Sequence, residues 1–176
     1  MKKLEDYVVS IPDFPKEGII FRDITSVVQN PDGLELAINT LLEMIEFESI
    51  DVVVGPEARG FIFGMPLAYE LHKGFVMIRK KGKLPRETVS CSYELEYGQA
   101  EVEIHKDAIK PGQRVVLVDD LLATGGTMEA NIKLVESLGG IVVKVLFLIE
   151  LDGLGGRERL KGYDVESAIV YEEKLD

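Results

Sequence analysis

The chain has 176 residues, of which 46% are hydrophobic and 29% charged, and its formal net charge is −11. A chain of this length and composition is typical of one globular domain with a substantial core. The negative charge argues against a nucleic-acid-binding protein, because such a protein needs a basic face for phosphates. An acidic protein can still bind a polyanionic small molecule if it gathers cationic side chains and backbone donors at one place.

The sequence carries no signal for a membrane or an oxidising compartment. No apolar run approaches the roughly 20 residues of a membrane span, and the lysine-rich start is not followed by an apolar signal segment. Cys91 is the single cysteine, so an internal disulfide is excluded and a reducing compartment is favoured. We therefore expect a cytoplasmic protein with no membrane or nucleic-acid partner.

Predicted strands and helices alternate along the chain. Residues 1–7 are an amphipathic lead-in, and the Pro- and Gly-rich residues 11–18 predict irregular structure. Helix spacing or β-branched apolar runs then mark a series of elements. The alternation predicts an α/β fold with a central, mostly parallel, doubly wound sheet flanked by helices and a ligand site at the carboxyl ends of its strands. The predicted helices are 31–48 (with Asn30 as N-cap), 61–72, 128–138 and a short one in 153–161; the strands are 50–54, 75–78, 115–118, 141–149 and 165–170.

Residues 79–86 form the only dense basic run of this acidic chain. Such a run is either a solvated turn or an anion site, and the charge pattern alone leaves both open. Residues 87–97 favour β structure and residues 101–104 alternate like a returning strand, so a long hairpin or mobile flap is expected after the basic run.

Residues 115–127, VVLVDDLLATGGT, are the most informative stretch. An apolar strand buried on both faces is followed by two acids, by small Gly and Thr residues, and by a helix. Backbone N–H groups and the positive end of the helix dipole would face an anion there, and the acids beside it suit hydroxyl groups. A phosphorylated sugar with two adjacent hydroxyls satisfies both halves. The stretch is neither a P-loop nor a Rossmann fingerprint, since both glycine patterns are missing.

This stretch resembles the phosphoribosyl-pyrophosphate (PRPP) signature of the type I phosphoribosyltransferases. Further segments resemble, in order and spacing, the adenine phosphoribosyltransferases of that family, so the resemblance covers nearly the whole chain. It implies one domain, 1–176, with a small N-terminal hood at about 1–30 and a flap at about 81–101. The matching segments are FP…GIIFRDI (14–24), GPEARGF (55–61), RKKGKLP (79–85) and YELEYG (93–98).

The resemblance implies that adenine and PRPP react to give AMP and pyrophosphate with Mg²⁺, in a homodimer active in purine salvage. In such families the loop at residues 57–60 often carries a cis peptide, expected here between Glu57 and Ala58. By the same resemblance, one set of residues binds each part of PRPP. The pyrophosphate set is Glu57, Ala58, Arg59, Gly60, Arg79, Lys80 and Lys83; the ribose and metal set is Asp119 and Asp120; and the 5′-phosphate set is Ala123, Thr124, Gly125, Gly126 and Thr127.

The base site decides the substrate. Relatives specific for hypoxanthine and guanine carry an acid in the phosphate loop, where this chain has Ala123. The resemblance instead assigns the catalytic proton transfer to Glu96, together with a catalytic role for Arg59, and has Tyr97 close over the site. It assigns the adenine pocket to Ile20, Phe21, Arg22 and Leu121. Cys91, His72 and His105 have no nucleophile or metal-ligand spacing.

Three rival functions remain at this stage. A transferase for another base, such as xanthine or hypoxanthine, is disfavoured by Ala123 and the flap motif. A PRPP-binding regulator of RNA or DNA would need a basic face or an added domain. A PRPP synthetase-like or purely structural relative is disfavoured because the chain is short and its flap and base segments are complete.

Overall fold

A computed structural model describes residues 2–95 and 98–172 of the chain. Its centre is a seven-stranded sheet in the order β5-β6-β4-β3-β7-β8-β9. The neighbours from β4 to β9 pair in parallel, whereas β6 pairs antiparallel with both β4 and β5. The mostly parallel α/β architecture is therefore as predicted. The strands are β3 (Val52–Pro56), β4 (Gly74–Lys80), β5 (Thr88–Leu95), β6 (Gly98–His105), β7 (Arg114–Leu122), β8 (Ile141–Asp152) and β9 (Val165–Glu172).

Helices cover both faces of the sheet because the central strands are apolar on both sides. In β7, Val116 and Val118 pack into the core beneath α2 (Pro31–Glu43) and α3 (Arg59–Glu70), whereas Val115 and Leu117 pack beneath α4 (Gly126–Ser137). This alternation follows from the twofold side-chain period of a strand. All four of these β7 side chains are fully buried.

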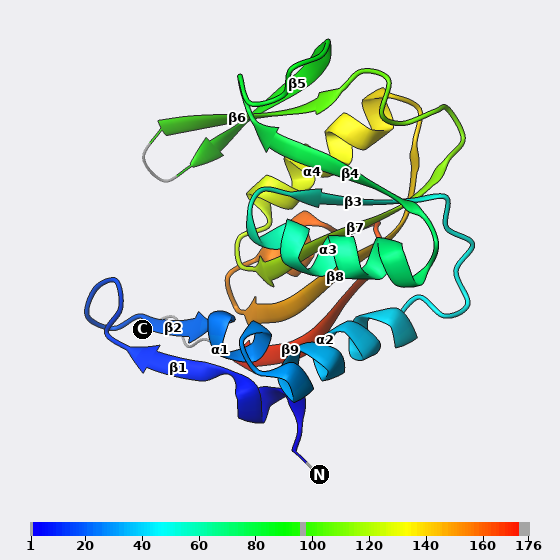
Figure 1. The fold of residues 1–176 in the computed structure, drawn as a ribbon. Helices are drawn as coiled ribbons and strands as arrows, with labels where there is room; N and C mark the ends of the chain where they lie inside the picture. Colours follow the sequence, from blue (N-terminus) through cyan, green and yellow to red (C-terminus); the bar gives the residue numbers. More distant parts are fainter. Residues whose placement is uncertain (1, 96–97, 173–176) are drawn as a thin grey trace.

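Two hairpins lie at opposite edges of the sheet (Figure 1). The short strands β1 (Val9–Pro12) and β2 (Ile20–Asp23) form a separate antiparallel sheet near β9, and the β5–β6 hairpin forms the other edge. The carboxyl ends of β3, β7 and β8 lie between them. The remaining elements are a 3₁₀ helix (Leu4–Tyr7) and the one-turn helices α1 (Thr25–Val28) and α5 (Gly156–Arg159).

Several predicted boundaries are wrong. The expected irregular segment 11–18 contributes Ile11 and Pro12 to β1, because edge pairing with β2 overrides the local composition. The helix expected to reach residue 48 ends at Glu43 and continues as turns. Its start is right, since the Asn30 side chain accepts hydrogen bonds from the N–H groups of Asp32 and Gly33 at 3.0 and 3.1 Å.

Candidate active site

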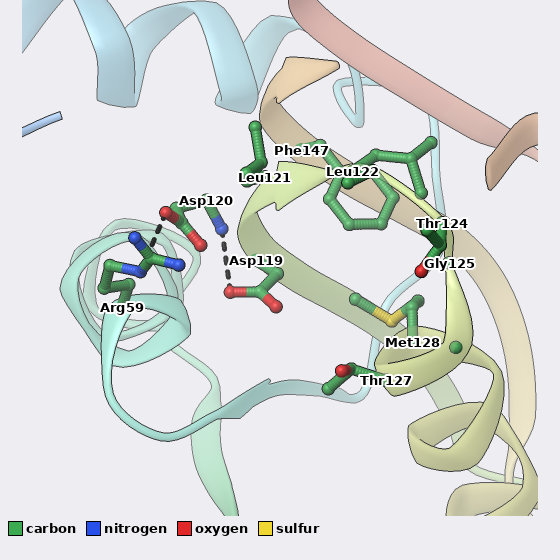
Figure 2. Close-up of a pocket in the computed structure, with 12 residues that line it drawn as sticks. Arg59, Asp119, Asp120, Leu121, Leu122, Thr124, Gly125, Thr127, Met128 and Phe147 are labelled. Carbon is green, nitrogen blue, oxygen red and sulfur yellow. Dashed lines mark hydrogen bonds and ion pairs between the residues drawn. The ribbon is translucent and has the colours of Figure 1, made fainter. Parts of the chain in front are cut away.

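The candidate site is a pocket at the carboxyl end of β7, where the loop of residues 123–125 leads into α4 (Figure 2). Gly125 has φ of 80°, a left-handed conformation that glycine adopts at little cost. No side chain of the described residues caps α4, so the N–H groups of its first turn are left to a ligand. The pocket is lined by Arg59, Asp119, Asp120, Leu121, Leu122, Ala123, Thr124, Gly125, Gly126, Thr127, Met128 and Phe147.

Asp119 and Asp120 form an acidic pair at this edge, and both belong to β7 itself. The strand runs four residues beyond the predicted end at residue 118, because β8 continues to pair with it as far as Leu122. The Asp119 carboxylate accepts a hydrogen bond from the Asp120 N–H at 2.8 Å. Burial raises the pKa of Asp119 well above its usual value, and the neighbouring charge of Asp120 adds to the rise. Burial also raises the pKa of Asp120, although Arg59 opposes that shift.

Arg59 reaches this acid pair from the first turn of α3. Its Nε lies 3.0 Å from the Asp120 carboxylate, and the arginine side chain is 50% exposed (Figure 2). Gly60 allows this approach, since a Cβ there would lie 2.6 Å from the Pro56 side chain and 3.0 Å from the Val118 carbonyl oxygen. The helix start thus packs directly on β3 and β7, and the arginine has charge to offer to a ligand.

The segment of residues 57–60 connects this pocket to the basic run. The peptide between Glu57 and Ala58 is cis, as the resemblance led us to expect. The Glu57 carboxylate accepts a hydrogen bond from Arg79 Nε at 2.6 Å, so the turn after β3 is held to the end of β4. Neither Lys80 nor Lys83 has a side-chain partner within the described ranges, and both are exposed.

The predicted adenine residues are only partly brought to the pocket. Leu121 lines it, whereas Ile20, Phe21 and Arg22 lie on β2 and are not among its lining residues. The Arg22 guanidinium donates to Ser10 Oγ at 2.7 Å and lies 3.9 Å from the centre of the Tyr171 ring. The Phe21 ring packs edge-on against Phe14 at 5.2 Å. The two predicted flap residues, Glu96 and Tyr97, lie outside the described residues.

Sequence reasoning missed two groups of residues around the site. Met128 and Phe147 form part of the apolar lining of the pocket. In the sequence they cannot be distinguished from ordinary core residues. Glu103 anchors the basic run, because its buried carboxylate accepts hydrogen bonds from the Leu84 N–H at 3.0 Å and from the Thr88 hydroxyl at 3.3 Å. An acid on a predicted strand gave no hint of this contact.

An acidic pair beside an uncapped helix start and a glycine–threonine loop is the donor and acceptor set that a phosphorylated ribose requires. The class of protein indicated by this fold and site is a phosphoribosyl-transfer enzyme.

Comparison with known proteins agrees with this class. Residues 24–173 match the family model described as the phosphoribosyl transferase domain. The chain is 63% identical over 174 residues to adenine phosphoribosyltransferase of Lachnoclostridium phytofermentans, covering 99% of this chain and 100% of that one. The chain belongs to the phosphoribosyltransferase family.

Solved structures of adenine phosphoribosyltransferases have the same fold. The enzyme from Thermoanaerobacter pseudethanolicus matches with a TM-score of 0.92 at 55% identity, covering 96% of this chain and 98% of that one. The enzyme from Saccharomyces cerevisiae, complexed with an imino-altritol bisphosphate and adenine, matches with a TM-score of 0.88 at 41% identity, covering 94% of this chain and 96% of that one.

The residues described here contain no helix long and apolar enough to span a membrane.

Proposed function

We propose that this chain transfers the 5-phosphoribosyl group of PRPP to adenine, giving AMP and pyrophosphate in purine salvage. The observation that carries the proposal is the pocket that joins the acid pair of β7 to the Gly/Thr loop at the start of α4. Relatives that match over the full length are adenine phosphoribosyltransferases, and the yeast structure was solved with adenine.

The 5′-phosphate of PRPP sits in the loop of residues 123–127. Backbone N–H groups and the Thr124 and Thr127 hydroxyls donate to its oxygens, and the positive end of the α4 dipole faces it. Asp119 and Asp120 accept hydrogen bonds from the ribose hydroxyls. This arrangement holds the ribose with its C1 atom directed away from the loop, toward the base and the leaving group.

The pyrophosphate lies beside residues 57–60. Arg59 exchanges its contact with Asp120 for the pyrophosphate oxygens, a change supported by its half-exposed side chain. Arg79, fixed by Glu57, adds positive charge there, and so do Lys80 and Lys83, whose side chains have no partner in the described part of the chain. Charge builds on the pyrophosphate as its bond to ribose C1 breaks, so fixed cations lower the barrier to this step.

Adenine lies between the hood and the pocket, against Leu121 and the β2 residues Ile20, Phe21 and Arg22. Glu96 removes the proton from the attacking purine nitrogen, and Tyr97 covers the base. Ala123 supports the choice of adenine, since no acidic side chain in the phosphate loop is available to a 6-oxopurine. The β1–β2 hairpin acts as the hood and the β5–β6 hairpin as the flap of one domain.

Mg²⁺ is the proposed cofactor and enters with PRPP. Among the described residues, no group of three or more His, Cys, Asp or Glu side chains could hold a metal ion by itself. Mg²⁺ typically binds one or two carboxylates together with substrate phosphates, and Asp119 and Asp120 fit that donor set. When bound, it supplies positive charge that stabilises the leaving pyrophosphate.

A homodimer is also proposed, with α3 and β4 at its interface. Both elements carry exposed large apolar side chains: Met65 is 55% exposed, Tyr69 82% and Met77 44%. Exposed apolar surface is typical of protein interfaces. The basic run at the end of β4 would then lie near the partner's site.

A cytoplasmic location is proposed as well, and the free thiol of Cys91 fits it.

The function is tested by measuring pyrophosphate release from PRPP and Mg²⁺ with adenine, hypoxanthine, guanine and xanthine in separate assays. We expect release with adenine alone. Glu96→Gln should lower kcat by about 10²–10⁴-fold, the range of a general acid or base, and the exposed neighbour Glu94→Gln should leave it unchanged. Preference for a 6-oxopurine would refute the assignment of the base site. The absence of pyrophosphate release with every base would refute the enzymatic function.

A further inference from the structure

The short helix α5 packs directly behind the phosphate loop. A Cβ on Gly156 would overlap the carbonyl oxygen of Ala123, and a Cβ on Gly125 would lie 3.2 Å from the carbonyl oxygen of Gly156. The two segments therefore touch backbone to backbone. Whatever fixes α5 also fixes the wall of the 5′-phosphate site.

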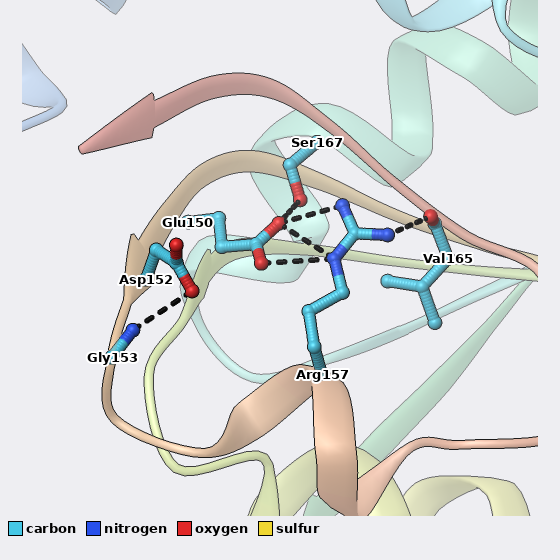
Figure 3. A network of polar contacts seen from close by, with 6 residues as sticks. All are labelled: Glu150, Asp152, Gly153, Arg157, Val165 and Ser167. Atoms are coloured by element: carbon cyan, nitrogen blue, oxygen red, sulfur yellow. Dashed lines mark hydrogen bonds and ion pairs between the residues drawn. The ribbon is translucent and has the colours of Figure 1, made fainter. Parts of the chain in front are cut away.

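An ion pair fixes α5 (Figure 3). The guanidinium of Arg157 donates three hydrogen bonds to the Glu150 carboxylate at 2.7–3.0 Å and another to the Val165 carbonyl oxygen. The Ser167 hydroxyl donates to the same carboxylate at 2.7 Å. The Glu150 side chain is only 4% exposed, so the ion pair connects α5 to a buried carboxylate on β8.

Arg159 follows two residues later and points toward the phosphate loop. A Cβ added to Gly126 would lie 2.8 Å from Arg159 Nη1. Gly126 is the first residue of α4, and the Cα–Cβ direction in a helix tilts toward its N-terminus. The guanidinium therefore lies alongside the first turn of α4, next to the pocket but not among the residues that line it.

The Arg159 guanidinium has no partner among the described side chains, so its charge is available to a ligand. The donors that line the loop itself are neutral, being backbone N–H groups and the hydroxyls of Thr124 and Thr127. A helix N-terminus contributes only about half a positive charge, whereas a phosphate monoester carries about −1.5 to −2 at pH 7. The phosphate loop itself thus lacks a full positive charge. Arg59 lines the same pocket but is paired with Asp120, whereas Arg159 lies beside the loop.

We propose that Arg159 is a further substrate-binding residue, which donates to the 5′-phosphate of PRPP and is held in position by the Glu150–Arg157 ion pair. This inference rests on the proposed PRPP site. Arginine suits the role because its planar guanidinium can make two parallel hydrogen bonds to phosphate oxygens. The guanidinium swings from the side of Gly126 onto the phosphate when the substrate enters the loop.

Arg159→Gln tests the proposal, with Lys161→Gln as the matched control. Lys161 is exposed and lies 3.4 Å from Glu158, so its variant removes the same charge from the same segment. We expect Arg159→Gln to raise the KM for PRPP about tenfold, with kcat and the KM for adenine within twofold of wild type. Lys161→Gln should change none of the three. Equal KM values for PRPP in both variants would overturn the proposal.

Direct binding separates this inference from the enzymatic function. Calorimetric titration with ribose 5-phosphate should show about tenfold weaker binding to Arg159→Gln, whereas inorganic pyrophosphate should bind equally to variant and wild type. Arg159→Lys should bind ribose 5-phosphate with intermediate strength, and it decides the question if Arg159→Gln unfolds. Weaker ribose 5-phosphate binding in a protein that turns over no base would uphold Arg159 while the proposed reaction failed. Unchanged binding in an active enzyme would refute Arg159 alone.

Discussion

Arg157→Ala should destabilise the fold strongly at neutral pH, because it leaves the Glu150 carboxylate buried without its counter-ion. Removing one partner of a buried ion pair costs about 3–5 kcal/mol. The lower end, about 3 kcal/mol, is expected here because the Arg157 side chain is 47% exposed, so water can enter in its place, and because Ser167 still donates. In a chain of this size the corresponding fall in Tm is roughly 6–12 °C.

The pH dependence of this loss gives a second test. Burial by itself would raise the pKa of Glu150, but the hydrogen bonds from Arg157 and Ser167 outweigh it and lower the pKa. In the wild type this carboxylate therefore stabilises the fold above its unfolded pKa, and the contribution is lost as pH falls through the lower folded pKa. In Arg157→Ala burial dominates and the folded pKa rises, so protonation relieves the destabilisation as pH falls toward the unfolded value.

Urea unfolding of both proteins at pH 7 and pH 5 measures the effect. The difference in free energy of unfolding should be largest at pH 7 and smaller at pH 5. Arg86→Ala is the matched control, since Arg86 pairs with Asp107 at 3.1 Å on the surface. Its effect on the free energy of unfolding should be much smaller than that of Arg157→Ala, because exposed ion pairs contribute little. This account of the ion pair would be refuted if the two proteins had the same free energy of unfolding at pH 7, or if the difference between them were larger at pH 5.

Two further variants probe the site. Asp119→Asn should lower activity about 100-fold, as when a charge-stabilising group is lost. It should nevertheless raise Tm at pH 7, because burial raises the pKa of Asp119 and this acid therefore costs stability above its unfolded pKa. Activity near wild type, or a lower Tm, would contradict this. Gly156→Ala should raise the KM for PRPP at least about tenfold, because the new methyl displaces Ala123. Gly74→Ala is the control and should leave the KM for PRPP unchanged, because no atom lies within 4 Å of its new Cβ. Steady-state kinetics with PRPP on both variants measures the difference, and equal KM values would contradict the prediction.

Local patterns predicted the sheet strands, the longer helices and the Gly/Thr loop between β7 and α4. In β7 the apolar run of residues 115–118 is buried on both faces as expected, and the Gly/Thr loop follows where the strand ends. These features depend on side-chain period, on glycine conformation and on neighbours along the chain. The sequence carries them directly, which is why residues 119–127 were found as one site.

Contacts between distant segments could not be predicted in the same way. No local pattern links Glu57 to Arg79, or Arg59 to Asp120, because each pair meets only when neighbouring strands of the sheet align their carboxyl ends. The β1 strand was missed for a related reason. Its proline and serine are not typical of a strand, and β1 is a strand only because it pairs with β2.

By itself, the sequence determined the class of fold, the acid pair and the phosphate loop, since these are written in consecutive residues. The tertiary structure decided which charges are already neutralised and which are free. Arg157 and Arg159 are alike in sequence, yet Arg157 is bound to Glu150 whereas Arg159 lies beside Gly126 with no partner among the described residues. The difference arises because helix α5 turns one side chain toward the β8–β9 sheet and the other toward the phosphate loop, and that orientation exists only in the folded chain.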